Sequence, residues 1–430
     1  LFNATTGAGN VAIGKSAGEN TTTGPNNVFI GLNAGKSLTT VEDNIAIGKD
    51  ALDGASSTST SQTIAIGTQA ASGALAGHNN IAIGYQSMLV ATSAFLNTAL
   101  GNQTLLALTT GDNNVAIGKG TLAANTTASD NTGVGYFALN ANTTGTNNTA
   151  LGVNSMTANT TASDNVAVGR NTLLANTTGA NNTAVGSQAL DANTTASGNT
   201  AIGKGTLGVN TTGVDNVAIG HSALDANTTA HNNVAVGVNA LGANTTATAN
   251  VAIGTNAMLL NTTGTNDTAV GYLALDANTT GEDNTAVGKG ALGANTTASG
   301  NTAVGKDSLV TNTTGANNVA VGWIALTTNS TGANNVGVGR SALASNSTGG
   351  DNVAVGFQAL NANSTGASNT AVGYTALTTN TTAVDGTAVG HRALTAVTTG
   401  ASNTGIGHDA GDAVTTGANN VLIGNDAGSD

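Results

Sequence analysis

The hydrophobic and polar positions of this chain repeat on a five-residue motif, Asn-(Val/Thr)-Ala-(Val/Ile)-Gly. Residues 165–169 and 182–186 are two successive copies. The (Val/Ile) position recurs 25 times between Ile13 and Ile423, always 17 residues apart except for one step of 19 residues, from Ile47 to Ile66. A fixed period of this length is the sequence signature of a solenoid.

Each coil is predicted to contain two short strands. Val166 and Val168 are β-branched residues two positions apart, as in a strand. A second apolar column, which includes Leu190, lies four residues after each Gly and predicts a second strand over Ala189–Asn193. The invariant Gly marks a corner that every coil turns in the same way. The expected fold class is therefore all-β: a parallel β-solenoid, a two-sheet β-roll of about 25 coils of 17 residues.

The Ala column inside the motif points to the face opposite Val and Ile. It holds only Ala or Gly in 23 of 25 coils, which indicates close packing, because water would tolerate larger polar residues. We expect this column to pack against another chain in a homotrimer, with the roll interior as the alternative. The candidate inter-chain residues are Ala167, Ala184, Ala201 and Ala218.

The repeat runs through residues 1–430, which we treat as one solenoid array. Residues 1–36 and 407–430 are expected to be atypical capping coils, because the Leu column becomes Gly there. Residues 37–110 are less regular and include a two-residue insertion within Ser56–Gln62, whereas residues 111–406 are regular.

Two columns hold Asn and are expected to form ladders of hydrogen bonds between coils. The members singled out in the second ladder are Asn159, Asn176, Asn193, Asn210 and Asn227. Because Asn193-Thr194-Thr195 is also an N-glycosylation sequence, glycan attachment stays open, although glycans on every coil would clash. The paired Thr columns leave ice binding as a lesser alternative, with only one rank of Thr able to face outward.

The position directly after the corner Gly is the best candidate for binding a partner. In 17 of 25 coils it holds an aromatic, basic or His side chain. It is either simply an exposed column that accepts long side chains or an adhesive stripe, because aromatic residues and Arg often anchor interfaces. The candidate stripe residues are Tyr85, Lys119, Tyr136, Arg170, Lys204, Tyr272, Trp323, Arg340, Phe357 and Tyr374.

Composition narrows the possible partners. The net charge of −12 disfavours nucleic acid, whose binding relies on cations. No apolar run approaches the roughly 20 residues of a membrane helix, so we expect no membrane insertion within this chain. We also expect no cofactor, no metal site and no enzymatic activity, because no catalytic motif appears and the histidines have no recurring partner. A start at Leu1 suggests a piece of a longer protein.

The motif resembles the head repeat of YadA-like trimeric autotransporter adhesins, as in Asn114–Gly118, Asn216–Gly220 and Asn250–Gly254. The stretch Asn182–Gly213 is similar to repeats of phage tail-fibre-like and bacterial surface proteins. This resemblance implies a left-handed roll and a homotrimer. The 17-residue coil is longer than that of the adhesin heads, and the sequence holds no coiled-coil stalk or membrane anchor.

We therefore expect an extracellular fibre, stalk or adhesin at a cell or virion surface. Its partners would be copies of itself, in a homotrimer or filament, and a surface glycan or receptor. A glycan-binding module that uses the stripe is the main alternative, and the target ligand stays open.

Overall fold

The computed structural model describes residues 3–55 and 58–429. Contacts divide the chain into two compact units, residues 1–215 and 216–430, and each is described by itself. Residues 56 and 57, within the segment predicted to hold the insertion, and residues 1, 2 and 430 of the predicted capping coils lie outside the described residues.

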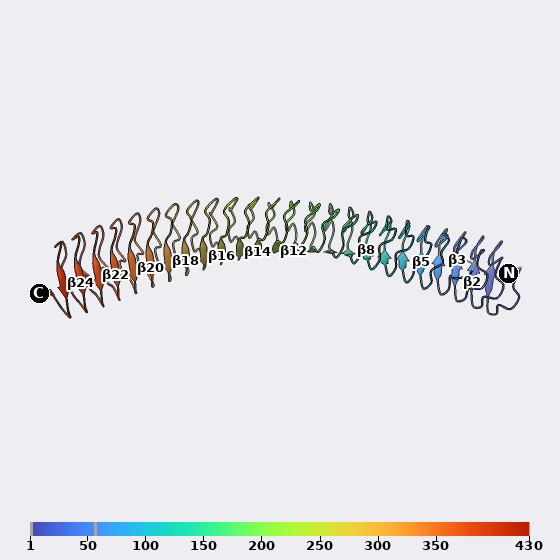
Figure 1. The fold of residues 1–430 in the computed structure, drawn as a ribbon, viewed down its shortest axis with the longest axis horizontal. Coiled ribbons are helices and arrows are strands. Elements are labelled where there is room, and N and C mark those ends of the chain that lie inside the picture. Colours follow the sequence, from blue (N-terminus) through green and yellow to red (C-terminus); the bar gives the residue numbers. More distant parts are fainter. Residues whose placement is uncertain (1–2, 56–57, 430) are drawn as a thin grey trace. The chain divides into compact units, whose positions relative to one another are not determined.

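Strands occupy the three central residues of each motif (Figure 1), and the described residues contain no helix. The strands of the first unit are β1 Val11–Ile13, β2 Val28–Ile30, β3 Ile45–Ile47, β4 Ile64–Ile66, β5 Ile81–Ile83, β6 Thr98–Leu100, β7 Val115–Ile117, β8 Thr132–Val134, β9 Thr149–Leu151, β10 Val166–Val168, β11 Thr183–Val185 and β12 Thr200–Ile202. Those of the second unit are β13 Val217–Ile219, β14 Val234–Val236, β15 Val251–Ile253, β16 Thr268–Val270, β17 Thr285–Val287, β18 Thr302–Val304, β19 Val319–Val321, β20 Val336–Val338, β21 Val353–Val355, β22 Thr370–Val372, β23 Thr387–Val389, β24 Thr404–Ile406 and β25 Val421–Ile423.

Within each unit, every strand pairs in parallel with the next strand along the chain. The motif stays in register, so that Ala167 of β10 lies opposite Ala184 of β11. The prediction of an all-β parallel solenoid with 17-residue coils is confirmed.

The predicted second strand is wrong, because Ala189–Asn193 forms turns. Gln188 and Leu190 have φ angles of 60° and 51°, in the left-handed region, whereas a strand needs strongly negative φ. Leu pays a steric cost of about 1–2 kcal/mol in this conformation. Burial of a Leu side chain, which contributes about 1.5–3 kcal/mol, offsets that cost. Each unit therefore has one sheet, closed on its other side by turns.

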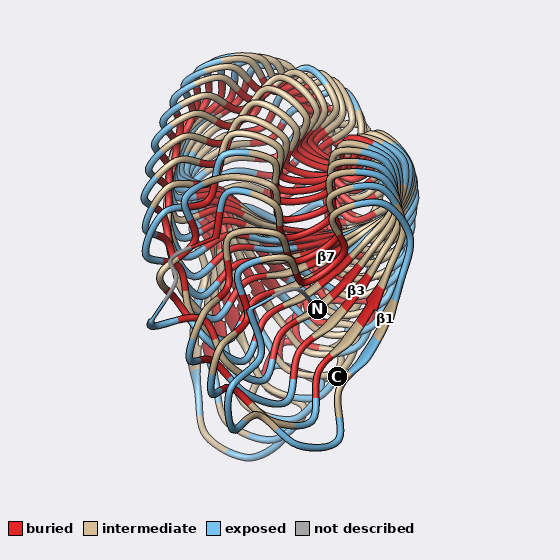
Figure 2. Ribbon diagram, turned by 90° about the vertical axis from the view of Figure 1, so that its right-hand side faces the viewer, coloured by how far each residue is buried: buried red, intermediate tan, exposed pale blue. Residues whose placement is uncertain are grey.

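The Ala column faces the interior of its own chain, which overturns its assignment to an inter-chain contact. Ala167, Ala184, Ala201 and Ala218 are each 0% exposed. The middle residue is buried in every strand from β2 to β24, and Figure 2 shows these buried stretches inside the coils.

The turn that precedes each strand explains why this column is small. In β20 the column holds Gly337, and a Cβ added there would lie 3.2 Å from Cδ1 of Leu326, eleven residues earlier. The Leu and Ala columns therefore pack against each other, and the Leu side chain leaves room for little more than a methyl group. The Val, Ile and Thr side chains of the strands consequently lie on the outer face of the sheet.

In β2 and β25 the strand column holds a large residue, and the Leu-column position six residues later holds Gly. Phe29 replaces Ala in β2, and a Cβ added to Gly35 would lie 2.4 Å from the Phe29 ring. At the other end, Leu422 replaces Ala in β25, and a Cβ on Gly428 would lie 2.8 Å from its Cδ2. Gly35 and Gly428 both occupy the Leu column, so in these coils the large side chain comes from the strand instead of the turn.

The corner Gly is required for two reasons. Gly169 has a φ of 138°, and a Cβ there would lie 2.7 Å from the carbonyl oxygen of Gly186 in the next coil. A side chain would therefore be strained and would also separate the coils.

Both predicted Asn ladders are confirmed. In the first, the backbone N–H of Asn182 donates to Oδ1 of Asn165 at 2.9 Å, and its Nδ2 donates to Ala196 O at 2.9 Å. In the second, Nδ2 of Asn193 donates to Oδ1 of Asn176 at 2.9 Å and to Ala196 O at 3.0 Å. Because the Asn193 amide is fully buried and bonded, the folded coil leaves no space for a glycan on it.

Candidate functional site

The residues after the corner Gly form a column on the surface, which we call the stripe. Of the ten stripe residues singled out from the sequence, nine are exposed and Phe357 is half-buried. Trp323 is 46% exposed and Tyr374 is 51% exposed, so both have wide contact with solvent. The left-handed residue that follows each stripe position, such as Asn171 with a φ of 55°, turns the chain back toward the core.

In the second unit, six consecutive stripe residues form a continuous stack. The Arg340 guanidinium lies between two rings, 4.5 Å from the Trp323 centroid and 5.6 Å from that of Phe357. The Phe357 and Tyr374 centroids are 5.1 Å apart, with an interplanar angle of 17°. The stack continues from Tyr374 to His391 at 5.1 Å, and from His391 to His408 at 4.8 Å. The strand spacing of about 4.8 Å imposes this distance, because each coil contributes one side chain.

The remaining stripe residues are more scattered. The Lys119 ammonium lies 5.8 Å from the Tyr136 centroid, and that of Lys289 lies 5.9 Å from the Tyr272 centroid. In the described part of the chain, Tyr85, Arg170 and Lys204 make no aromatic or cation–π contact. The sequence thus predicted the exposure of the stripe, but not which members touch.

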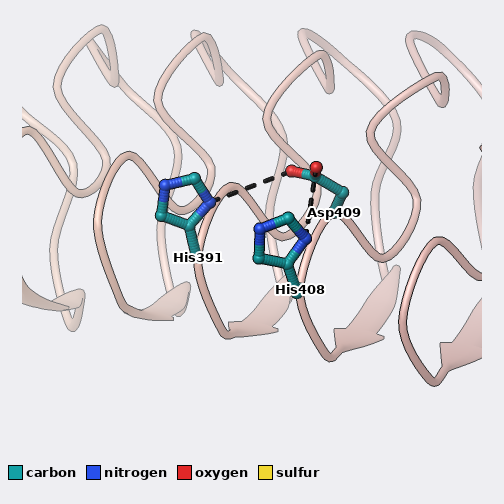
Figure 3. Close-up of side chains that lie close together, drawn as sticks. All are labelled: His391, His408 and Asp409. Atoms are coloured by element: carbon teal, nitrogen blue, oxygen red, sulfur yellow. Dashed lines mark ion pairs between the residues drawn. The ribbon is translucent and has the colours of Figure 1, made fainter.

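A cluster of His391, His408 and Asp409 lies at the end of the stack (Figure 3). The Nδ1 atom of His408 is 3.2 Å from Oδ2 of Asp409, and that of His391 is 4.0 Å from Oδ1. No metal site was predicted from the sequence, because its histidines have no recurring partner. The signal that was missed was the spacing of 17 residues between two stripe histidines, the second followed directly by Asp.

The Asp409 carboxylate is held in place by its surroundings. Its side chain is only 16% exposed, and its backbone N–H donates to His391 O at 2.9 Å. Nε of Arg392 lies 3.4 Å from Oδ1 of Asp409. That oxygen is buried and accepts no hydrogen bond, so its polar contacts are those with Arg392 and His391. Two imidazole nitrogens and one carboxylate are a set of atoms that can coordinate a metal ion.

The outer face of the sheet is a second exposed surface. Each strand presents its first and third residues, such as Val166 and Val168 of β10, and no outer strand residue is buried in any of the described strands. Both columns are uncharged and consist of Val, Ile, Leu and Thr. On the corner beside Asn193, Thr195 is exposed while Thr194 is half-buried and donates to Thr211 O at 3.3 Å. Only one rank of this Thr pair faces outward, as the sequence predicted.

A hollow of about 480 Å³ lies on the turn side of the second unit. Gly290 and Gly293 line it together with larger residues of the neighbouring coils, such as Leu273 and Val310. Asp276 also lines it, and burial raises the pKa of that carboxyl. No pattern in the sequence predicted this hollow.

The described part of the chain contains no helix long and apolar enough to cross a membrane. No protein-family model and no curated protein matches this sequence.

Proposed function

We propose that this chain is a structural segment of an extracellular fibre, stalk or adhesin that acts at a cell or virion surface, and that it is not an enzyme. One observation carries the proposal: the repeated Asn side chains are taken up by hydrogen bonds between neighbouring coils, as in the Asn165–Asn182 contact. What every coil offers to a partner is the stripe and the outer face of the sheet. A scaffold that repeats the same surfaces suits attachment at many points.

The stripe is the proposed adhesive surface. Exposed Tyr, Trp and Arg are the residue types that most often anchor interfaces. Trp323 and Arg340 are already held by their mutual contact at 4.5 Å, so binding would cost less side-chain entropy there. The partner would be a receptor or a surface glycan.

The test compares the whole chain with two matched sets of substitutions. One variant carries Ser at five stripe positions: Tyr85, Tyr136, Tyr272, Trp323 and Tyr374. The control carries Thr, which many coils have naturally, at five outer-face positions: Val166, Val217, Val234, Val319 and Val353. We expect adhesion to cells and to a glycan array to be lost in the stripe variant alone. Adhesion that survives in the stripe variant and fails in the control would overturn the assignment.

For contacts between copies of the chain, we propose the outer face of the sheet. The Ala column cannot serve, because its side chains are buried in their own chain. The outer face is uncharged and β-branched, and large exposed apolar surfaces usually mark interaction sites. Replacing Thr183, Thr200 and Thr285 with Glu should lower the sedimentation coefficient from that of an oligomer to that of a monomer. An unchanged oligomer would exclude this face.

Glycan binding by ring stacking is a second candidate function, favoured by the isolated Tyr85. Sugars pack on the faces of aromatic rings, but Tyr374 has Phe357 and His391 stacked on its two sides at 5.1 Å each. Among the described residues, no ring stacks on Tyr85. A true stacking site should therefore lose glycan binding with Tyr85→Ser and keep it with Tyr374→Ser; the reverse result would contradict this candidate.

A further inference from the structure

We propose that His391, His408 and Asp409 form a binding site for a divalent transition-metal ion such as Zn²⁺. Each residue offers one ligand atom, and these atoms all lie within 4.8 Å of one another. The site does not depend on the proposed adhesive function, because it rests on the geometry of the cluster alone.

The distances suit a shared ion. Zinc binds His nitrogen and carboxylate oxygen at about 2.0–2.2 Å, which places ligand atoms about 3.3 Å apart in a tetrahedral site. Nδ1 of His408 is already 3.2 Å from Oδ2 of Asp409, whereas Nδ1 of His391 is 4.0 Å from the other oxygen, Oδ1, so the His391 ring must move closer for one ion to bind all three residues. Figure 3 shows the Nδ1 atoms of both rings turned toward the carboxylate.

The coil geometry holds the ligands before any ion arrives. Strands β23 and β24 pair in register, with Val389 opposite Ile406, and this pairing fixes the two stripe histidines side by side. Their rings are nearly parallel, with an interplanar angle of 7°, and because the Nδ1 lone pair lies in the plane of the ring, at least one ring must rotate before both nitrogens can coordinate one ion. The Asp409 backbone is tied to His391 O by a 2.9 Å hydrogen bond.

A second observation concerns the hydrogen bonding of the Asp409 carboxylate, whose Oδ1 has only the ion-pair contacts with Arg392 and His391. Oδ1 of Asp409 is buried and accepts no hydrogen bond in the described structure. Buried polar atoms in folded proteins nearly always have a partner, so each exception calls for an explanation. A metal ion on the carboxylate would supply one.

The ligand types select the kind of metal. Imidazole suits Zn²⁺, Cu²⁺ and Ni²⁺, whereas Ca²⁺ and Mg²⁺ prefer sites made of oxygen atoms. Three protein ligands leave a fourth position open for water or for a group from a partner.

The positive charge of Arg392 opposes metal binding at this cluster. Its Nε lies 3.4 Å from Oδ1 of Asp409, so its positive charge opposes that of a metal at the same carboxylate. The Arg392 side chain is 46% exposed, which lets it move into solvent when an ion binds. Removal of this charge should strengthen metal binding, an effect opposite to that of removing a ligand.

The experiment is a calorimetric titration of the full chain, free of any histidine tag, with ZnCl₂. We expect one equivalent to bind, and we expect His391→Ala, His408→Ala and Asp409→Asn each to weaken binding about tenfold or more. Asn suits the left-handed backbone at position 409, where φ is 52°, so Asp409→Asn keeps the turn. Arg392→Gln should tighten binding.

His221→Ala is the matched control, because His221 is an exposed stripe histidine of the same unit outside the cluster. Its affinity should equal that of the unsubstituted chain. Visible absorption of bound Co²⁺ gives a second readout, because its d–d bands report the coordination geometry. The proposal is overturned if no saturable binding occurs, or if His391→Ala and His408→Ala bind as tightly as His221→Ala.

Discussion

Oδ1 of Asp267 accepts two hydrogen bonds from Asn284, from the backbone N–H at 2.8 Å and from the side-chain amide at 3.1 Å. Asp267 stands in the first Asn ladder, where 22 coils have Asn. Its side chain is fully buried, and this burial raises its pKa to about 7. Near neutral pH, a carboxyl thus replaces the amide that the ladder normally uses. Its second oxygen, Oδ2, accepts from Nδ2 of Asn278 at 3.1 Å.

The stability of the second unit should fall as the pH rises. The folded state holds the Asp267 proton more tightly than the unfolded chain, where the pKa is 3.8. The stabilisation is therefore complete below pH 3.8 and is lost as the pH rises through about 7. The change is on the order of 4 kcal/mol. Urea unfolding at a series of pH values, followed by the fluorescence of Trp323, measures it.

Asp267→Asn should restore the ladder and remove this pH dependence. The free energy of unfolding at pH 8 should rise by up to about 4 kcal/mol, with little change at pH 4. The expectation fails if Asp267→Asn and the unsubstituted chain keep the same pH slope, since the other carboxyls with raised pKa values are common to both.

The reverse change, from Asn to Asp, should destabilise the ladder of the first unit. The Asn182 amide donates to Asn165 Oδ1 and to Ala196 O, and a carboxylate would face both acceptors without a proton to donate. We expect Asn182→Asp to destabilise the coil by about 3–5 kcal/mol at pH 8 and by less at pH 4. Hydrogen exchange of the amides around β11 reports the local effect. Exchange that is equally fast at the two pH values, after correction for intrinsic rates, would argue against a buried charge.

The pairing of Phe29 with Gly35 predicts rescue by a double substitution. Phe29→Ala should cost about 3–5 kcal/mol, because it leaves a cavity. Gly35→Leu should also destabilise, because the Phe29 ring occupies the space. Together they give this coil the Ala and Leu that interior coils hold at these two positions, such as Ala46 and Leu52, and the backbone at Gly35 has a φ of 60°, close to the 51° of Leu52.

Thermal unfolding of the four proteins in this cycle gives the coupling energy between the two sites. We expect the double variant to be more stable than the sum of the single changes predicts, by about 1–3 kcal/mol. Simple additivity would show that the two positions do not share a space.

The 17-residue period predicted most of the fold, because each backbone requirement that recurs in every coil is met by one type of residue. The corner at Gly169 and the ladder at Asn193 could be predicted, since few other residues meet those needs. The inward face of the strand could not be predicted. Val166, Ala167 and Val168 are all apolar, and alternation alone does not say which face is inside. The sequence held one signal for the inward face: the large Phe29 in the strand column goes with the small Gly35 in the Leu column. Residues compensate in size in this way only when they share a core.

The candidate site was predictable only in part. Exposure of the stripe followed from its variable, long side chains. Stacking of Trp323 on Arg340, and the approach of His391 to Asp409, depend on the orientation of side chains in successive coils, which the period does not contain.

A Glu substitution should strongly reduce stability on one face of a strand and have little effect on the other face. Ala184 is 0% exposed, whereas Thr183, its neighbour in β11, lies on the outer face. Ala184→Glu would put a larger, charged side chain into the space filled by a Leu side chain, and we expect it to unfold the surrounding coils at a cost of 4 kcal/mol or more, roughly. Thr183→Glu leaves the carboxylate in water and should change stability by about 0.5 kcal/mol or less. Circular dichroism and limited proteolysis of both variants separate these outcomes. If Ala184→Glu gave a folded chain that only dissociated from its copies, the Ala column would be an interface after all; loss of the coil itself is the result that interior packing requires.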